Sequence, residues 1–173
     1  MQFTDTQLDA IDHFVYQTCL VAIQHIKNVV ELRKAQDRTL GYHSRLLERL
    51  LHPEDALIYK GTSKAALEHS ASKYKEHIVP MVYLQDAIWA LVEQGEKSDA
   101  QLAQLLKNHL GVAYITKEEA HKLDHELSLK TNMPKEWLLG TSDPLDRLKA
   151  AGILLLNDDG TEVTSLLSPT DKV

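Results

Sequence analysis

Apolar residues recur with a helical period through the first fifth of the chain. The period is carried by Leu8, Ile11, Val15, Ala22, Ile26 and Val29. Thr4 and Gln7 have the spacing of a capping box, and no glycine or proline interrupts the pattern before Gly41. The pattern predicts one long helix over residues 5–36. Its middle, residues 14–23, is apolar nearly all round, which favours a place at the centre of a bundle or between two chains.

Shorter amphipathic segments follow, separated by glycine and proline. A leucine-rich second helix is predicted to end at residues 52–53, because the residue before a proline avoids helical backbone. Ser63 is expected to cap a third helix that runs toward His77, and Pro80 prevents its smooth continuation into the next helix. Together with the first helix, these segments predict an N-terminal helical bundle over residues 1–95.

The pattern after residue 95 mixes short helices with β-prone runs. Residues 112–115 are apolar and partly β-branched, which predicts one short strand. Thr116 and Glu119 form a further capping box, for a helix near residues 117–128. Two segments that start at proline predict additional short helices, since proline is tolerated at the first helical position.

The last apolar runs indicate a β-hairpin. Residues 153–156 and 161–163 flank the turn sequence Asn-Asp-Asp-Gly at 157–160, and Gly160 is expected at positive φ. The predicted fold class is therefore mainly α: the N-terminal bundle is followed by a small α+β part at 96–167 that ends in a hairpin and resembles a winged helix. Residues 168–173 are predicted to be a flexible tail.

Composition and charge narrow the function classes. Of 173 residues, 43% are hydrophobic and 25% charged, as in an ordinary globular protein, and the net charge is -6. An acidic chain is a poor candidate for broad, sequence-independent DNA binding, which needs clustered Lys and Arg. Basic residues outnumber acidic ones over residues 27–49. This pattern is typical of a solvent-exposed helix face, and a local contact with nucleic acid is the alternative.

Cys19 is the only cysteine, which excludes an intramolecular disulfide and a cysteine metal cage, and a buried, inert thiol is expected there. The apolar run around it is about half the length that a bilayer requires. With no secretory leader at the first residues, we expect a cytoplasmic protein without a membrane anchor.

Glu76 and His77 stand next to each other, and Pro80 follows three residues after the histidine. This pattern resembles the opening of the HNH nuclease motif, in which a strand ends on a metal-binding acid and a water-activating histidine. The resemblance implies a divalent metal and catalytic roles for both residues. The second half of that motif, with an Asn or His on a helix, does not follow in sequence. The alternative is a helix end, where His77 binds the last carbonyl groups and Glu76 faces water.

Arg38 and His43 have the Arg-x4-His spacing of HEPN ribonucleases. In that family the two residues lie on a helix at a dimer interface and act on RNA phosphates, so the resemblance implies catalytic roles for them. The alternative is that both side chains solvate the turn between the first two predicted helices.

Glu118, His121 and His125 fall on one face of the helix predicted near 117–128. Spacings of three and four residues align such side chains as zinc or di-metal sites require, with further ligands supplied by other elements. The alternative is a solvent-exposed helix face that also contains Lys122 and Asp124.

No complete catalytic constellation emerges from these patterns, and no glycine-rich phosphate loop or serine nucleophile elbow is present. The sequence therefore favours a non-catalytic regulatory or adaptor protein without a cofactor, which binds a protein partner or a second copy of itself through its apolar first helix. Two alternatives stay open. One is a small metal-dependent HNH-like nuclease, or a HEPN-like one, and the other is a winged-helix DNA-binding regulator.

Overall fold

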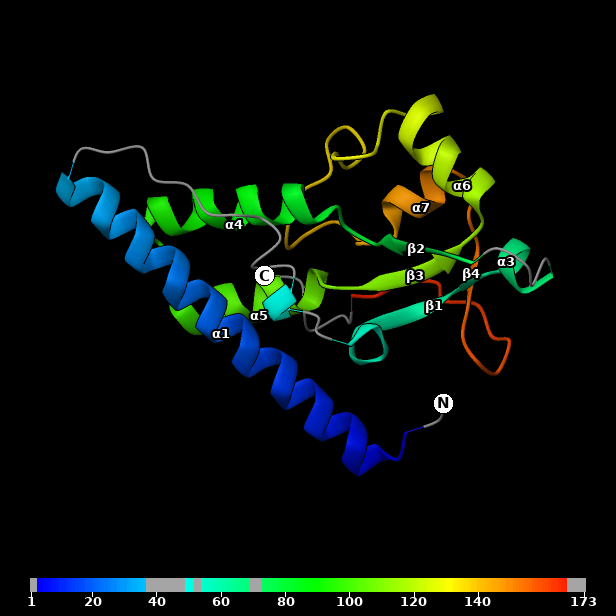
Figure 1. Ribbon diagram of the computed structural model, residues 1–173, viewed down its shortest axis with the longest axis horizontal. Coiled ribbons are helices and arrows are strands. Elements are labelled where there is room, and N and C mark those ends of the chain that lie inside the picture. Colours follow the sequence, from blue (N-terminus) through cyan, green and yellow to red (C-terminus); the bar gives the residue numbers. More distant parts are fainter. Residues whose placement is uncertain (1–2, 37–48, 52–53, 69–72, 168–173) are drawn as a thin grey trace. The chain divides into compact units, whose positions relative to one another are not determined.

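The computed structural model describes residues 3–36, 49–51, 54–68 and 73–167 (Figure 1). The described chain is mainly helical and contains one small four-stranded sheet. Its elements, in chain order, are α1 (Asp5–Gln36), η1 (Asp55–Leu57), β1 (Tyr59–Ser63), α3 (Lys64–Glu68), β2 (Tyr74–His77), α4 (Met81–Gln94), α5 (Asp99–His109), β3 (Val112–Ile115), α6 (Lys117–His121), the π-helical turn η2 (Lys122–Glu126), α7 (Asp146–Ala150) and β4 (Leu155–Leu156).

The chain forms two compact units that alternate along the sequence. The first, called the helical unit below, comprises Met1–Leu57 and Gln85–Lys107. The second, called the sheet unit, comprises Ile58–Leu84 and Asn108–Val173. The sequence pattern instead predicts a single division of the chain near residue 95, and that division into domains stays a prediction.

Helix α1 has the bounds that the sequence predicts. The backbone N–H of Thr4 donates to Gln7 Oε1 at 2.9 Å and that of Gln7 to Thr4 Oγ1 at 3.4 Å, which forms the expected capping box. One side of the helix is buried, and Cys19 lies on that side. Cys19 is 0% exposed, which confirms that its thiol is buried, and this burial raises the pKa of the thiol to about 12.

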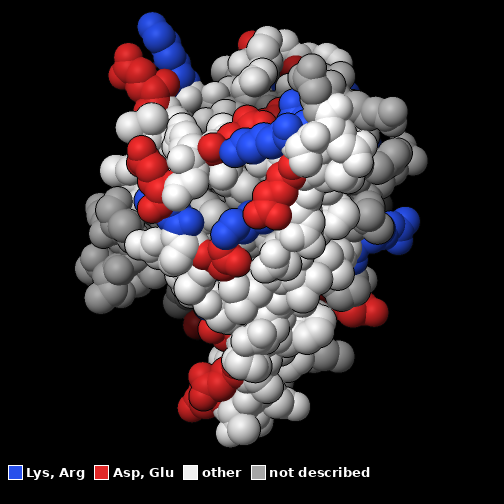
Figure 2. Space-filling view, turned by 90° about the vertical axis from the view of Figure 1, so that its left-hand side faces the viewer, with Lys and Arg blue, Asp and Glu red and all other residues white. Residues whose placement is uncertain are grey.

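Ion pairs join α1 to the other helices of the helical unit. They are Lys27–Asp99, Arg33–Glu93 and Lys107–Asp12, and the guanidinium of Arg33 also lies 5.3 Å from the Trp89 ring centroid. In Figure 2, basic side chains are interspersed with acidic ones and form no continuous patch among the residues coloured there. The basic excess near residue 27 is therefore largely neutralised on the described part of α1, where Lys27 and Arg33 each have an acidic partner.

The sheet has the strand order β2-β3-β1-β4. Strand β3, which confirms the strand predicted at 112–115, pairs antiparallel with β2 and parallel with β1, while β1 pairs antiparallel with β4. Helices α6 and α7 pack against the sheet (Figure 1). The π-helical turn lies between these two helices in the sequence. The shared core consists of Ile78, Ala113, Ile115, Ala120, Leu123, Leu129, Leu145, Leu148, Ala151, Ile153 and Leu155. No helix among the described residues is long and apolar enough to cross a membrane.

The prediction of a third helix from Ser63 to His77 is wrong. Ser63 does cap a helix, since its Oγ accepts the backbone N–H of Ala66 at 3.0 Å, but α3 ends at Glu68. Residues 74–77 form strand β2 and pair with β3 along its whole length. Strand pairing with a distant partner outweighs the weak helical preference of this short segment, because β propensity depends on tertiary context.

The C-terminal hairpin is confirmed in its main features. The Asn157 N–H donates to the Thr161 carbonyl at 2.8 Å, and the Val163 N–H donates to that of Leu155 at 3.0 Å. Gly160 has φ of 84°, as expected for this turn. Strand β4 is only two residues long and pairs with β1 inside the mixed sheet, so the winged-helix resemblance is not confirmed.

Replacing Gly160 with valine should lower the free energy of unfolding by about 1 kcal/mol or more, because a β-branched residue resists positive φ. Among the described residues, no atom lies within 4 Å of the position that a Cβ would take, so the expected cost comes from the backbone. Urea denaturation followed by circular dichroism measures it. Gly160→Asn is the matched control and should lose less, since asparagine tolerates this conformation. Equal losses in the two variants would contradict the backbone explanation.

Candidate functional site

A buried ion pair forms at the end of β2, where the sequence places its first catalytic candidates. Arg147 of α7 donates from Nη1 to Glu76 Oε1 at 2.8 Å and to the carbonyl oxygen of His77 at 2.9 Å. Its Nε donates to the Leu129 carbonyl at 2.8 Å. The Arg147 side chain is 0% exposed and that of Glu76 is 12% exposed. One guanidinium therefore joins β2, α7 and the segment after the π-helical turn.

Burial governs the electrostatics of this pair. It raises the pKa of the Glu76 carboxyl above its ordinary value, because the ionised carboxylate loses its water. The charge of Arg147 and its hydrogen bond lower this pKa but offset the burial only in part, and the negative charge of Asp124 raises it further. Among the described residues, Arg147 Nη2 is a buried nitrogen without a hydrogen-bond partner. The pair is thus costly to bury and is held by three good hydrogen bonds.

Arg147 is the residue that the sequence analysis missed. It lies on a short helix beside Leu148 and four residues before Ala151, both of which are buried. An arginine in such a helical pattern is a signal that could have been noticed. The partners of Arg147 could not have been identified from the sequence, because Glu76 is 71 residues away in the chain.

Glu76 has a structural role in this arrangement, because its carboxylate neutralises a buried guanidinium. The strand that contains it also contacts α6, so the helix with His121 lies beside the strand with His77 in the sheet unit. Helices α4 and α5 separate these two elements in sequence. The catalytic roles of Glu76 and His77 stay predictions. Arg38 and His43 lie outside the described residues, and the HEPN-like assignment likewise stays a prediction.

The structure brings together two of the three predicted metal ligands. The rings of His121 and His125 have centroids 4.6 Å apart and planes inclined by 39°. His121 has a 65% exposed side chain, and its Nδ1 lies 4.0 Å from Glu126 Oε1. Within the described ranges, no three His, Cys, Asp or Glu side chains are grouped so as to hold a metal ion. The three-ligand set with Glu118 stays a prediction.

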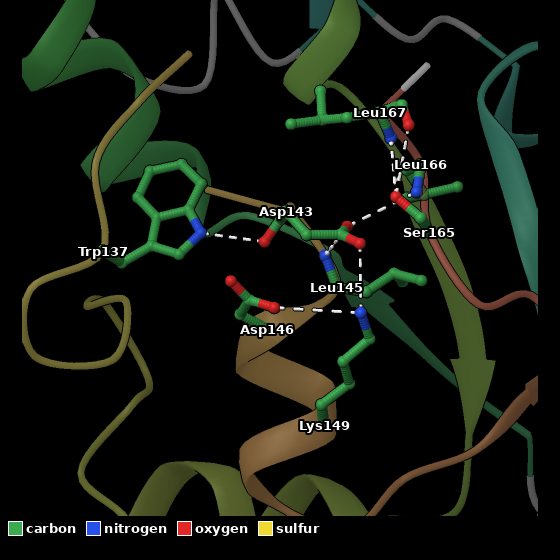
Figure 3. Close-up of polar contacts among 8 residues, drawn as sticks. All are labelled: Trp137, Asp143, Leu145, Asp146, Lys149, Ser165, Leu166 and Leu167. Carbon is green, nitrogen blue, oxygen red and sulfur yellow. Dashed lines mark hydrogen bonds and ion pairs between the residues drawn. The ribbon is translucent and has the colours of Figure 1, made fainter. Parts of the chain in front are cut away.

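Asp143 is the centre of a second polar cluster, at the start of α7 (Figure 3). Its carboxylate accepts the Leu145 N–H at 2.9 Å, the Leu166 N–H at 3.4 Å and the Lys149 ammonium at 3.0 Å. Partial burial alone would raise the pKa of Asp143, but these bonds, together with a hydrogen bond to the Ser165 side chain, outweigh it and hold the pKa below its ordinary value. The cluster fastens the C-terminal segment to α7, which is a structural role.

The sheet unit also contains a buried histidine. His109 is 2% exposed, and its Nε2 accepts the Gly140 N–H at 3.3 Å. Its ring meets Trp137 edge to face, with 5.6 Å between the centroids. Trp137 is itself 5% exposed, and its Nε1 donates to the Asp143 carbonyl at 2.9 Å. Trp137 therefore anchors the core of this unit, as its size predicts.

Comparison with protein-family models, with curated proteins and with solved structures finds no match to this chain. A functional assignment rests on the residues of the chain itself.

Proposed function

We propose that the protein is a non-catalytic regulatory or adaptor protein that works by binding protein through the outer face of α1. One observation carries the proposal. Four large apolar side chains of α1 are exposed. Leu8, exposed by 50%, lies on another side of the helix, whereas three share one face: Phe14, exposed by 46%, Val21 by 58% and Leu32 by 44%. Single exposed apolar residues are ordinary, but an aligned set on a rigid helix is typical of an interaction surface.

These three residues form one stripe, called the α1 stripe below. They are separated by seven and by eleven residues, close to two and three whole helical turns, so they lie within about 20° of one another around the helix. The side chains between them on the same face include Gln17, Gln24, His25 and Asn28, which are exposed, and none of these is an acid, a lysine or an arginine. A partner can therefore cover the stripe without burying a carboxylate, an ammonium or a guanidinium group.

The opposite side of α1 holds the stripe in place. Val15, Ile23 and Val30 are among its buried residues, and the ion pairs of Lys27 and Arg33 tie the helix to α5 and α4 within the helical unit. A surface that is ordered before binding loses less conformational entropy when a partner docks.

The occupant that fits the stripe is a second copy of the chain. In an antiparallel pair of α1 helices centred midway between Phe14 and Leu32, each Phe14 faces Leu32 of the other copy, and Val21 lies near the centre. This spacing is self-complementary, as a two-fold symmetric interface requires, since the same patch serves both subunits. Antiparallel packing also sets the two helix dipoles in opposition.

Sedimentation equilibrium tests the proposal. The wild-type chain should be a dimer at micromolar concentration, and Val21→Asp should make it a monomer with an unchanged circular dichroism spectrum, because it places two carboxylates at the centre of the interface. Phe14→Ser should weaken the dimer as well.

Leu138→Ser is the matched control, because Leu138 is 62% exposed but lies in the sheet unit. It should leave the dimer intact. A wild-type chain that stays monomeric at high micromolar concentration would contradict the proposal, as would a dimer that is indifferent to both α1 substitutions.

A further inference from the structure

We infer that His121 and His125 form a two-histidine binding site for a transition-metal ion of the zinc class, on the exposed side of α6 and the π-helical turn. The site is distinct from the α1 stripe and does not depend on the proposed function. It needs neither Glu118 nor the pair Glu76 and His77.

The backbone at this place is unusual. The Leu127 N–H donates to the Lys122 carbonyl at 3.0 Å, which is the five-residue hydrogen bond of a π helix. Such turns are rare, and they are frequent at functional sites. The wider turn brings side chains four residues apart closer to alignment than an α helix does, and the two imidazole rings lie 4.6 Å apart.

Hydrogen bonds on two sides hold the π-helical turn in place. Thr116 and Glu119 form the capping box of α6, and Ser63 Oγ of β1 donates to the Glu119 carboxylate at 2.6 Å. On the other side, Lys122 Nζ donates to the Ala151 carbonyl at 2.7 Å. These bonds hold the backbone of both histidines, so little order has to be gained when an ion binds.

The local charge favours a cation. Asp124 and Glu126 belong to the same turn, while Lys122, the basic residue between the two histidines, is directed to the Ala151 carbonyl. Glu126 Oε1 lies 4.0 Å from His121 Nδ1, and a small rotation of these exposed side chains would form an N–H···O bond. A carboxylate in that position fixes the imidazole so that Nε2 faces the metal.

Two imidazoles define the class of ion. Nitrogen donors suit Zn²⁺, Cu²⁺ and Ni²⁺, whereas Mg²⁺ and Ca²⁺ prefer oxygen. Zn–N bonds are about 2.0–2.1 Å long, and the exposed rings can turn to bring both Nε2 atoms to that distance. Two protein ligands leave coordination positions open, so the ion can also take water or a donor from another molecule.

Isothermal titration of the full chain with Zn²⁺ alone tests the site. We expect one equivalent to bind, Cu²⁺ to displace it, and Mg²⁺ to have no effect. His121→Ala and His125→Ala should each weaken binding about tenfold or more, because loss of a mere outer-shell partner already costs about 10–100-fold. Both side chains are exposed, so both variants should fold, as circular dichroism will show.

His13→Ala is the control, because His13 is an exposed histidine that lies on α1, outside the π-helical turn. It should leave Zn²⁺ affinity unchanged. Failure of Zn²⁺, Ni²⁺ and Cu²⁺ to bind the wild type, or undiminished binding in both histidine variants, would overturn the inference.

Discussion

Replacing Arg147 with alanine is expected to lower the free energy of unfolding by about 3–5 kcal/mol. The substitution leaves the Glu76 carboxylate buried without its counter-charge and removes the donors for the carbonyl groups of His77 and Leu129. Removing one partner of a buried ion pair is more damaging than removing both, because the remaining charge stays uncompensated. Urea denaturation of the purified variant measures the loss.

Two variants test this explanation. The double variant Arg147→Met with Glu76→Leu should recover much of the lost stability, because apolar residues of similar size can replace a buried pair. Lys149→Ala removes the ion pairs of an exposed lysine from the same helix and should cost at most about 1 kcal/mol. If Arg147→Ala cost no more than Lys149→Ala, the buried pair would not be important for stability.

The loss in Arg147→Ala should also depend on pH. A carboxyl group whose pKa is raised by folding contributes stability below its ordinary pKa, and that contribution is lost as the pH rises through the folded value. The pKa of Glu76 is raised already, and removal of Arg147 raises it further. The loss should therefore be largest at neutral pH and shrink as the pH falls through the raised pKa, where Glu76 takes up a proton.

Replacing Ile23 with aspartate is expected to unfold the helical unit, because it buries a charge without a partner at a cost of about 4 kcal/mol or more. Ile23 is 0% exposed on the inner side of α1. Loss of the circular dichroism signal and of cooperative unfolding measures the effect.

Val21→Asp, two residues away, is the matched comparison. Val21 is 58% exposed, so the same substitution there should change stability by no more than about 0.5 kcal/mol and act on association alone. Unfolding in both variants would mean that the α1 stripe is part of the monomer's core. If both variants stayed folded, the assignment of the buried side of α1 would be wrong.

Part of the candidate site could be predicted from the sequence, because the residues concerned lie close together in the chain. The spacing of His121 and His125 placed both on one helix face, and the capping box of Thr116 and Glu119 fixed where that helix begins. The π-helical turn that aligns the two rings was not predictable, since no residue type demands it. Arg147 was missed for a different reason: a buried arginine is recognised by its partners, and these come from distant elements.

The sequence by itself determined the long first helix, strand β3, the capped helix α6 and the hairpin with Gly160 at positive φ, because each depends on periodicity, capping or turn chemistry within a few residues. Only the tertiary structure decided that residues 74–77 are a strand and that Glu76 binds Arg147. It also decided which side of α1 stays exposed. Strand pairing and burial join residues far apart in the chain, and their energies are set by partners that a local pattern does not contain.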